Sequence, residues 1–277
     1  MYFYELTAPV LIYANVNGTI LPGEAATTHL SQLQQNAHTG LLETMLVIDG
    51  AIQLKDLHWV RLLHGCEVIK LPPPSISKLE AEIHTLVGRN DLLALCRVRL
   101  QWLPGVQSSP ARYTIQCIPI TPELPDYNTI GLTISIASHI IKPIEPISNL
   151  KTTDLALYKE AASFAKGHHW DDALLVNESG LIIESSIANI FLVHGSIIST
   201  PPLTDGCVSG VFRRHLLDAL PDLGFSIQES SITQSSLFSA DEVFLSNAIR
   251  RIKWVRSIAT RTYNNSLSSK IHSLLFG

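Results

Sequence analysis

The segment from Glu184 to Arg213 carries the residues of this chain that are best suited to bind a charged small molecule. It contains three parts: Glu184-Ser-Ser-Ile-Ala-Asn189-Ile-Phe191, Ile198-Ser-Thr200 and Val208-Ser-Gly210-Val211-Phe212-Arg213. The third part begins a predicted helix that starts at Gly210 and extends to Leu220. Because the first N–H groups of a helix are free and its N-terminal end is positive, this helix start predicts a phosphate site. The alternative is that Gly210 only permits a tight turn.

All three parts resemble the signature of class IV aminotransferases, the fold-type IV enzymes that use pyridoxal 5'-phosphate (PLP), in residue type and in spacing. The resemblance implies an α+β fold of two domains, similar to D-amino-acid aminotransferase. A smaller N-terminal domain is then followed by a larger C-terminal PLP-binding domain. It also implies PLP as the cofactor, a small-molecule amino substrate and a homodimer. The match is good from Lys151 onward and covers only residues 42–63 before that point.

PLP chemistry requires a lysine that binds the aldehyde of the cofactor as a Schiff base and later moves protons. The resemblance places this lysine shortly before a helix, which an Asp-Ala-Leu-Leu strand follows. Lys151 has this position, because a predicted helix separates it from the run Asp172-Ala-Leu-Leu175. Lys159 is the competing candidate, about two helical turns further along. A single lysine is ordinarily a solvated surface charge, and the surrounding signature favours the catalytic role for Lys151 only.

Glu184 stands at the head of the signature, and the resemblance makes it the partner of the pyridine nitrogen of PLP. A carboxylate in that place keeps the nitrogen protonated, so that the ring can accept electrons from the substrate. The alternative is a strand-end glutamate in water. Asn189 belongs to the same signature and is interpreted as a residue that bonds the local backbone.

Further positions correspond to the phosphate site of the family. The resemblance places the phosphate on the amides of Val211 and Phe212, at the helix start. The loop Ser246-Asn247-Ala248 corresponds to a second phosphate loop, which supplies amides and hydroxyls. Arg61 lies in a His-Trp-Val-Arg-Leu run that is similar to the family's His-x-x-Arg-Leu helix, whose arginine contacts the phosphate. Without that context, an arginine on an amphipathic helix ordinarily lies on the solvated face.

The carboxylate of an amino substrate needs a cation near the aldehyde edge of PLP. Arg97 and Arg99 alternate on a predicted strand of the first domain, so both are expected on the same face. The family often places substrate-binding arginines on or after this strand. The alternative is that both face solvent on a half-exposed sheet. His168 and His169 are adjacent, but two histidines alone do not make a metal site, so no metal is expected.

Two reactions remain open for such an enzyme. One is that of 4-amino-4-deoxychorismate lyase, which releases pyruvate and forms 4-aminobenzoate for folate biosynthesis. The other is transamination of branched-chain or D-amino acids. Aminotransferases of the family commonly carry a Thr-Gly-Thr-Ala-x-Glu-Ile-like stretch at the second phosphate loop. The run Ser246-Asn-Ala-Ile-Arg-Arg-Ile252 looks more like the lyases, so the lyase is the preferred hypothesis.

Departures from the family pattern keep a third hypothesis open. The segment Gln35-Asn-Ala-His-Thr-Gly-Leu-Leu-Glu-Thr44 lacks the usual aspartate–arginine pair and the aromatic residue before Glu-Thr. Leu46 stands where many members carry an arginine, and Asp154 replaces a common asparagine. The first region helps to bind substrate in the family. The chain is therefore also considered as a PLP-binding protein without catalysis.

Short strands and helices must position these residues. Asn17-Gly18 and Asp49-Gly50 each predict a hairpin turn, because both positions tolerate positive φ. Helices are predicted over residues 55–70, 77–86 and 155–165, and strands over residues 95–102, 112–120, 132–136, 172–176 and 181–183. In the first helix, the spacing of Leu57, Val60 and Leu63 predicts one apolar side. The pattern suits two α+β domains.

The run Pro122-Glu-Leu-Pro125 is the best linker, and it predicts domains over residues 1–121 and 122–277. The chain has 277 residues, of which 46% are apolar and 16% charged, which is typical of a globular protein with a large core. A formal net charge of −4 provides no basic field for nucleic acid.

Four cysteines, at positions 66, 96, 117 and 207, show no metal spacing and are interpreted as reduced core residues. The sequence shows neither a signal peptide nor an apolar run of membrane-spanning length, so we expect a cytoplasmic protein that does not bind a membrane.

Overall fold

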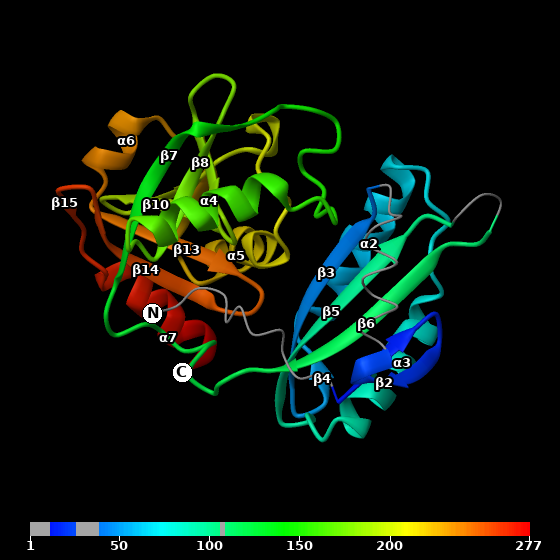
Figure 1. Ribbon diagram of the computed structural model, residues 1–277. Helices are drawn as coiled ribbons and strands as arrows, with labels where there is room; N and C mark the ends of the chain where they lie inside the picture. Colours follow the sequence, from blue (N-terminus) through cyan, green and yellow to red (C-terminus); the bar gives the residue numbers. More distant parts are fainter. Residues whose placement is uncertain (1–11, 26–38, 106–108) are drawn as a thin grey trace. The chain divides into compact units, whose positions relative to one another are not determined.

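The computed structural model describes residues 12–25, 39–105 and 109–277 (Figure 1). The chain folds into two compact units. Of the described residues, the N-terminal unit takes those of Glu5–Leu124 and Leu150–Asp154, and the C-terminal unit takes Pro125–Asn149 and Leu155–Gly277. The chain thus contributes a short second segment, which contains Lys151, to the N-terminal unit. Of the atypical segment before Glu43, residues 35–38 lie outside the described residues.

An antiparallel sheet of six strands, in the order β2-β1-β6-β5-β3-β4, forms the N-terminal unit. Its strands are β1 (Tyr13–Val16), β2 (Thr19–Pro22), β3 (Leu41–Ile48), β4 (Ala51–Ile52), β5 (Leu95–Leu103) and β6 (Arg112–Pro119). The two predicted hairpin turns are confirmed. Asn17 and Gly18 have φ of 53° and 89°, and Asp49 and Gly50 have φ of 49° and 75°. Positive φ at both central residues matches the twist of the flanking strands.

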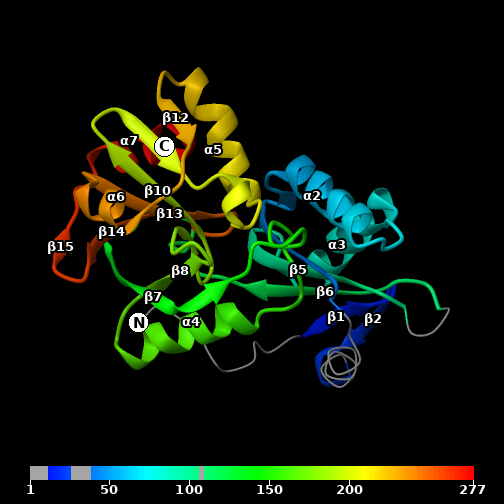
Figure 2. The ribbon, with the colours of Figure 1, turned by 90° about the horizontal axis from the view of Figure 1, so that it is seen from above.

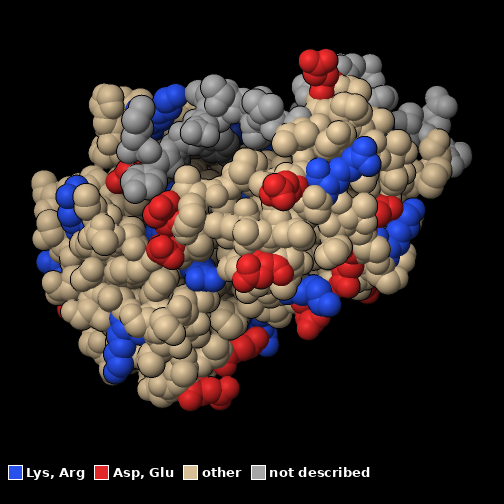
Figure 3. Space-filling model, turned by 90° about the horizontal axis from the view of Figure 1, so that it is seen from below, with Lys and Arg blue, Asp and Glu red and all other residues tan. Residues whose placement is uncertain are grey.

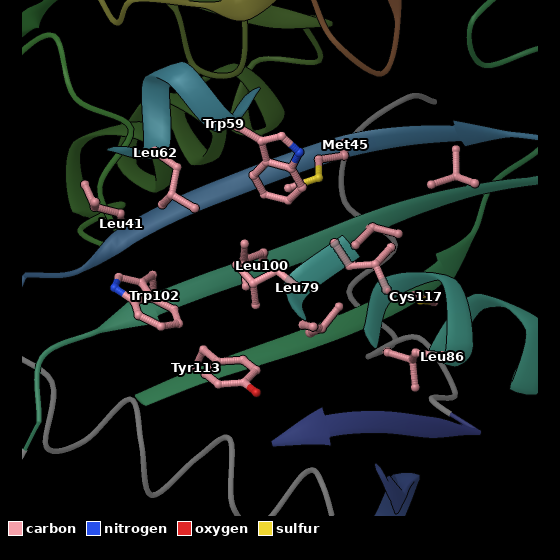
Figure 4. Close-up of a cluster of buried hydrophobic side chains, with 14 of the residues drawn as sticks. Leu41, Met45, Trp59, Leu62, Leu79, Leu86, Leu100, Trp102, Tyr113 and Cys117 are labelled. Atoms are coloured by element: carbon pink, nitrogen blue, oxygen red, sulfur yellow. The ribbon is translucent and has the colours of Figure 1, made fainter. Parts of the chain in front are cut away.

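Two helices, α2 (Lys55–Val68) and α3 (Ile76–Arg89), pack on one face of this sheet. The core between them contains Met45 of β3, Leu62 of α2, Leu79 of α3 and Leu100 of β5 (Figure 4). Successive side chains of a strand point to opposite sides of the sheet. Along each strand, residues that face the helices therefore alternate with residues that face away from them.

The predicted apolar side of α2 is wrong. Val60 and Leu63 are 65% and 39% exposed, whereas Trp59, Leu62 and Cys66 are buried. The residues of the second set also follow a helical spacing, and a tryptophan removes more apolar area from water than a valine. Trp59 is further fixed by a hydrogen bond of 2.7 Å from its Nε1 to a carboxylate oxygen of Glu80 on α3.

A mixed sheet of nine strands forms the C-terminal unit, in the order β12-β11-β10-β13-β14-β7-β8-β9, with β15 paired to β14. Its strands are β7 (Leu132–Lys142), β8 (Asp172–Asn177), β9 (Ile182–Ser185), β10 (Asn189–His194), β11 (Ile197–Thr200), β12 (Ser226–Glu229), β13 (Glu242–Asn247), β14 (Arg251–Ile258) and β15 (Arg261–Thr262). An additional pairing joins β10 to β9, so the strands from β10 round to β9 close on themselves. The closing pair is Asn189 and Glu184, two residues of the signature.

Helices of the C-terminal unit are α4 (Ala156–Gly167), α5 (Val211–Asp222), α6 (Gln234–Ser239) and α7 (Ser266–Phe276), with a short 3-10 turn η1 (Leu203–Asp205). Helix α4 packs on β7 and β8 (Figure 2). It buries Ala161, Ala162 and Ala165, whose small side chains allow a close approach to the sheet. A second apolar cluster, which includes Leu174, Ile190 and Val243, lies on the other side of the strands.

Acidic and basic side chains are interspersed among uncharged ones on the face seen in Figure 3. All four cysteines are free and buried, as expected for core residues. Among the described helices, none is both long and apolar enough to cross a bilayer. Within the same residues, no group of three or more His, Cys, Asp and Glu side chains could hold a metal ion.

Candidate active site

Glu184 is central to the predicted site residues of the C-terminal unit. It lies on β9, which pairs Glu184 with Leu175 of β8 on one side and with Asn189 of β10 on the other. Its side chain is 3% exposed. Oε1 accepts hydrogen bonds from Lys142 Nζ at 2.6 Å and from Tyr158 OH at 2.8 Å, and Oε2 accepts one from the amide of Val208 at 2.8 Å. The carboxylate is therefore buried, paired with a cation and held in one orientation.

The hydrogen bonds of Glu184 leave room for one more donor. A carboxylate offers about four lone-pair positions, and the structure fills two on Oε1 and one on Oε2. The N–H of a protonated pyridine ring fits the remaining position. Lys142 supplies the positive charge that makes an ionised carboxylate tolerable in the interior. The donor set thus fits the nitrogen end of PLP.

Sequence reasoning missed Lys142 and Tyr158. Lys142 ends the long strand β7 and also donates to the carbonyl of Ser148 at 2.9 Å, and Tyr158 lies on the first turns of α4. A lysine at a strand end and a tyrosine on a helix carry no local signal for a shared partner. Their approach to Glu184 depends on how β7, β8 and β9 pair and on how α4 packs.

The start of α5 carries the residues of the predicted phosphate site. Gly210 is the N-cap, with no side-chain hydrogen bond capping the helix, and the first helical bond joins Arg214 N to Gly210 O. The amides of Val211 and Phe212 precede that bond, so they have no partner within the helix. A Cβ on Gly210 would lie 2.0 Å from Asn189 Oδ1, so only glycine allows this approach.

Asn189 connects the parts of this half-site. Its Nδ2 donates to the carbonyl of Val208 at 2.9 Å, which is the backbone bond expected from the sequence. As a strand residue it pairs with Glu184 on one side and with Ser246 on the other. The carboxylate, the helix start next to Gly210 and the end of β13 are therefore neighbours of a single residue.

Ser246 and Asn247 end β13 with different hydrogen-bonding states. The Ser246 hydroxyl is buried and has no hydrogen-bond partner among the described residues. Asn247 Oδ1 accepts from the amides of Ile249 and Arg250 at 3.0 and 2.8 Å, and its Nδ2 donates to Ile187 O at 3.2 Å. Asn247 therefore shapes the turn after β13. The Ser246 hydroxyl, together with the amides of α5, fits the oxygens of a phosphate.

Lys151 lies in the N-terminal unit, beside the beginning of β3. The amide of Leu42 donates to Lys151 O at 2.8 Å, and the amide of Thr153 donates to Gly40 O at 2.9 Å. These bonds place Thr152 opposite Leu41 and Lys151 opposite Leu42. The segment thus extends the edge of the sheet as a short antiparallel strand. The competing Lys159 is exposed on α4 in the C-terminal unit.

Arg97 and Arg99 share a face of the N-terminal sheet, as their spacing predicts. Arg99 lies opposite Thr44 and Arg97 opposite Leu46, both on β3. Leu42 alternates onto this same face, and Lys151 lies opposite Leu42. The two arginines and Lys151 therefore belong to one face, the one turned away from α2 and α3.

Arg61 is bound by a carboxylate of the same unit, so it is not a solvated surface residue. Its side chain is 10% exposed. Arg61 Nε donates to Glu43 Oε1 at 2.8 Å, and Nη2 donates to Glu43 Oε2 at 2.5 Å. His58 Nδ1 lies 2.6 Å from the same Oε2. Glu43 thus binds one edge of the guanidinium, a planar group that carries N–H donors on more than one edge.

A further buried amine lies in the C-terminal unit. Burial, with the charges of Arg250 and Arg251 nearby, lowers the pKa of Lys253 to about 8. Lys253, Asp172 and Ser246 line a cavity of about 10 Å³, which has room for one water molecule and not for a cofactor. Lys253 therefore has a larger unprotonated fraction near neutral pH than an ordinary lysine, although most of it stays protonated.

The structure divides the predicted residues between the two units. Glu184, the α5 residues Val211 and Phe212, and Ser246-Asn247 belong to the C-terminal unit, where strand pairing and side-chain contacts connect them. Lys151, Arg61, Arg97 and Arg99 belong to the N-terminal unit. Each half contains groups that fit PLP or an amino substrate.

Comparisons with known proteins identify the family of this chain. The family model described as amino-transferase class IV matches residues 40–258. A Methanocaldococcus jannaschii protein provisionally named branched-chain-amino-acid aminotransferase is 25% identical over 243 residues, which are 84% of this chain and 83% of the relative.

Two solved structures share the fold. The branched-chain amino acid aminotransferase of Escherichia coli matches with a TM-score of 0.85 at 20% identity, over 96% of this chain and 93% of that chain. A Legionella pneumophila protein provisionally described as 4-amino-4-deoxychorismate lyase matches with a TM-score of 0.76 at 23% identity, over 85% of this chain and 90% of that chain. The α+β fold of fold-type IV enzymes is confirmed. Since the family model spans most of the sequence, the chain belongs to the class IV aminotransferases and is an enzyme whose cofactor is PLP.

Proposed function

We propose that this enzyme is an aminotransferase that acts on branched-chain amino acids. The sequence alone favours a lyase, but a relative that matches 84% of the chain carries the name of a branched-chain-amino-acid aminotransferase, which supports the alternative. The observation in the structure that carries the proposal is the shared face of Lys151, Arg97 and Arg99. An amine and two cations on one face suit a substrate that presents a carboxylate next to its reacting carbon.

Each residue then has a defined task. PLP, when bound, supplies an aldehyde and an electron-accepting ring. Lys151 binds that aldehyde and carries the proton that moves during the reaction, and Arg97 and Arg99 bind the substrate carboxylate. The α5 amides, Ser246 and Arg61 hold the phosphate, so the binding energy of a group remote from the reaction fixes the position of the ring.

Glu184 keeps the pyridine nitrogen protonated. Lys142 and Tyr158 occupy its Oε1, which leaves the remaining lone pair on Oε2 for the ring N–H. Lys142 Nζ lies 2.6 Å from Oε1, and an ionised carboxylate accepts a stronger hydrogen bond than a neutral group. Val208 N fixes the orientation of this oxygen. The family resemblance also leads us to propose a homodimer, which sedimentation of the PLP-loaded protein would test.

A substrate panel tests the proposal. The PLP-loaded protein is incubated with L-leucine, L-isoleucine, L-valine or D-alanine, each with 2-oxoglutarate, and glutamate is measured. We expect glutamate from the three L-amino acids and none from a Lys151→Ala control. Product from D-alanine alone would reassign the enzyme to D-amino acids. A bound cofactor that gives no product with any compound would support the hypothesis of a PLP-binding protein without catalysis.

The lyase remains a second candidate because of one feature, the turn after β13. Asn247 builds this turn with its own side chain, and the Asn-Ala-apolar run is the feature that resembles the lyases. The same protein sample is incubated with aminodeoxychorismate, and pyruvate is measured. Pyruvate release at a higher kcat/KM than transamination of leucine would favour the lyase.

A further inference from the structure

Arg61 belongs to a network of three side chains in the N-terminal unit, together with Glu43 and His58. Glu43 on β3 is 2% exposed and binds Arg61 through two hydrogen bonds, of 2.8 and 2.5 Å, one to each carboxylate oxygen. His58 is fully buried on α2, and its Nδ1 lies 2.6 Å from Glu43 Oε2. His58 precedes Arg61 by about one helical turn, so both side chains reach the same side of α2.

The protonation states of this network follow from its burial and charges. Burial would raise the pKa of Glu43, but Arg61 and His58 outweigh it and lower the pKa to about 2. Burial lowers the pKa of His58, with the charges of Arg61 and Lys151 acting in the same direction against Glu43. Glu43 is therefore ionised and His58 neutral. Because an ionised carboxylate only accepts hydrogen bonds, the single ring proton of His58 lies on Nδ1.

The other nitrogen of His58 shows that the ring is not in the core for packing alone. With the proton on Nδ1, Nε2 carries a lone pair, and this buried atom has no hydrogen-bond partner among the described residues. An unpaired buried acceptor costs free energy that an apolar side chain of similar size would not cost. Among the described residues, the one polar contact of the His58 ring, which a leucine could not make, is the hydrogen bond from Nδ1 to Glu43.

We propose that Glu43 and His58 are positioning residues for the phosphate of PLP, and that they act through Arg61. The pair of parallel hydrogen bonds fixes the plane of the guanidinium, and His58 fixes the carboxylate that makes those bonds. The orientation in which Arg61 meets a phosphate monoester is thereby set before the ligand binds. A rigid donor set loses less freedom on binding than a mobile one. This inference rests on the proposed contact between Arg61 and the phosphate.

The test compares the affinity of each variant for PLP with its affinity for pyridoxal, which has no phosphate. The ratio of the two dissociation constants isolates the phosphate contact, because a general weakening of the fold affects both ligands alike. The variants are Arg61→Ala, Glu43→Gln, His58→Leu and His58→Asn. Asparagine places an amide N–H where Nδ1 stands, so His58→Asn keeps the bond to Glu43, whereas His58→Leu removes it.

The preference for PLP is the dissociation constant of pyridoxal divided by that of PLP. We expect it to fall at least tenfold in Arg61→Ala, about tenfold in Glu43→Gln and about fivefold in His58→Leu. These changes are on the scale of residues that orient a ligand-binding group. His58→Asn should keep the preference within about twofold. Thermal unfolding of the ligand-free variants reports on the fold itself. Because two of the variants change only His58, the test does not depend on Glu43→Gln folding.

Two results would overturn the inference, and they are distinguishable. A preference unchanged in Arg61→Ala would show that Arg61 does not bind the phosphate, so the contact on which the inference rests would be wrong. A preference that falls in Arg61→Ala but not in Glu43→Gln or His58→Leu would leave Arg61 as the phosphate ligand. It would show that Glu43 and His58 only support the fold.

Discussion

Two buried carboxylates, Glu43 in the N-terminal unit and Glu184 in the C-terminal unit, each bind a cation, yet the cations differ. Arg61 donates hydrogen bonds from two N–H groups of its planar guanidinium, one to each carboxylate oxygen of Glu43. Lys142 contacts only Oε1 of Glu184, beside Tyr158, and the other oxygen accepts a backbone amide. Arginine fixes a geometry, whereas lysine supplies a point charge on a flexible stem.

This difference divides the work between the two carboxylates. Glu43 has both oxygens engaged with side-chain donors, so it is suited to hold Arg61 and His58 in place. Glu184 keeps one lone pair available while its charge is compensated, so it is suited to accept a hydrogen bond from a bound ring. A buried pair of a carboxylate and a cation can thus either hold neighbouring side chains in place or bind a ligand. Which of the two it does depends on how many acceptor positions of the carboxylate remain unoccupied.

The sharpest test of this division concerns the lysines. Lys151→Ala should abolish the covalent PLP adduct that borohydride reduces, because no other residue is expected to bind the aldehyde. Peptide mapping of the reduced protein identifies the modified lysine. An adduct on Lys142, the counterion of Glu184, would reverse the assignment. Mapping to exposed Lys159 or to Lys253, whose pKa is about 8, would also contradict the role of Lys151.

The next test removes the cation of Glu184. Lys142→Met leaves a buried carboxylate without its partner, so the free energy of unfolding should fall by about 3–5 kcal/mol. Denaturant unfolding measures this. Asp218→Asn breaks the exposed pair of Arg214 and Asp218 and should change stability by less than about 1 kcal/mol. Equal effects of the two variants would mean that Lys142 does not support Glu184 in solution.

Glu184→Gln tests whether the negative charge of Glu184, and not only its shape, supports the reaction. Glutamine retains the shape of the side chain but cannot keep the pyridine nitrogen protonated, so kcat should fall about 10²–10³-fold, the scale of a lost electrostatic contact in the transition state. Absorbance of the bound cofactor serves as the control for binding. An unchanged kcat would mean that Glu184 takes no part in the reaction and, like Glu43, only holds neighbouring side chains in place.

Arg99→Ala tests the face that carries Lys151. Loss of a charged hydrogen bond to the substrate carboxylate should cost about 1.5–3 kcal/mol in binding, which appears as a higher KM with PLP affinity unchanged. Arg97→Ala is the matched variant on the same strand, one alternation away. Steady-state kinetics with leucine measure both. If neither variant changes KM, the carboxylate has a partner elsewhere.

Glu43 should also make the stability of the protein depend on pH in the acid range. Its pKa is lowered from 4.5 to about 2, so the folded state binds fewer protons than the unfolded state between these values. The stabilisation is complete above about pH 4.5 and is lost as the pH falls towards 2. Unfolding free energies at pH 5 and pH 3 should therefore differ less in Glu43→Gln than in the unsubstituted protein. An unchanged difference would show that Glu43 is not the paired carboxylate.

Much of the local structure could be predicted because its causes lie in neighbouring residues. Asn17-Gly18 and Asp49-Gly50 specify hairpins through their tolerance of positive φ, and the alternation of Arg97 and Arg99 implies a shared face. The buried side of α2 could not be predicted in the same way, because Leu57, Val60 and Leu63 have a helical spacing as good as that of the residues which are buried. Only packing against the sheet selects between two apolar stripes.

The family, the cofactor and the helix start next to Gly210 could be inferred without any structure, because all three parts of the signature lie in one segment, from Glu184 to Arg213. Which groups bind those residues depends instead on how the elements pack. Lys142 and Tyr158 meet Glu184 only through the pairing of β7, β8 and β9 and the packing of α4. Glu43 and Arg61 meet only because α2 packs on β3. Such contacts join residues far apart in the chain, and no local preference of the backbone or side chains encodes them.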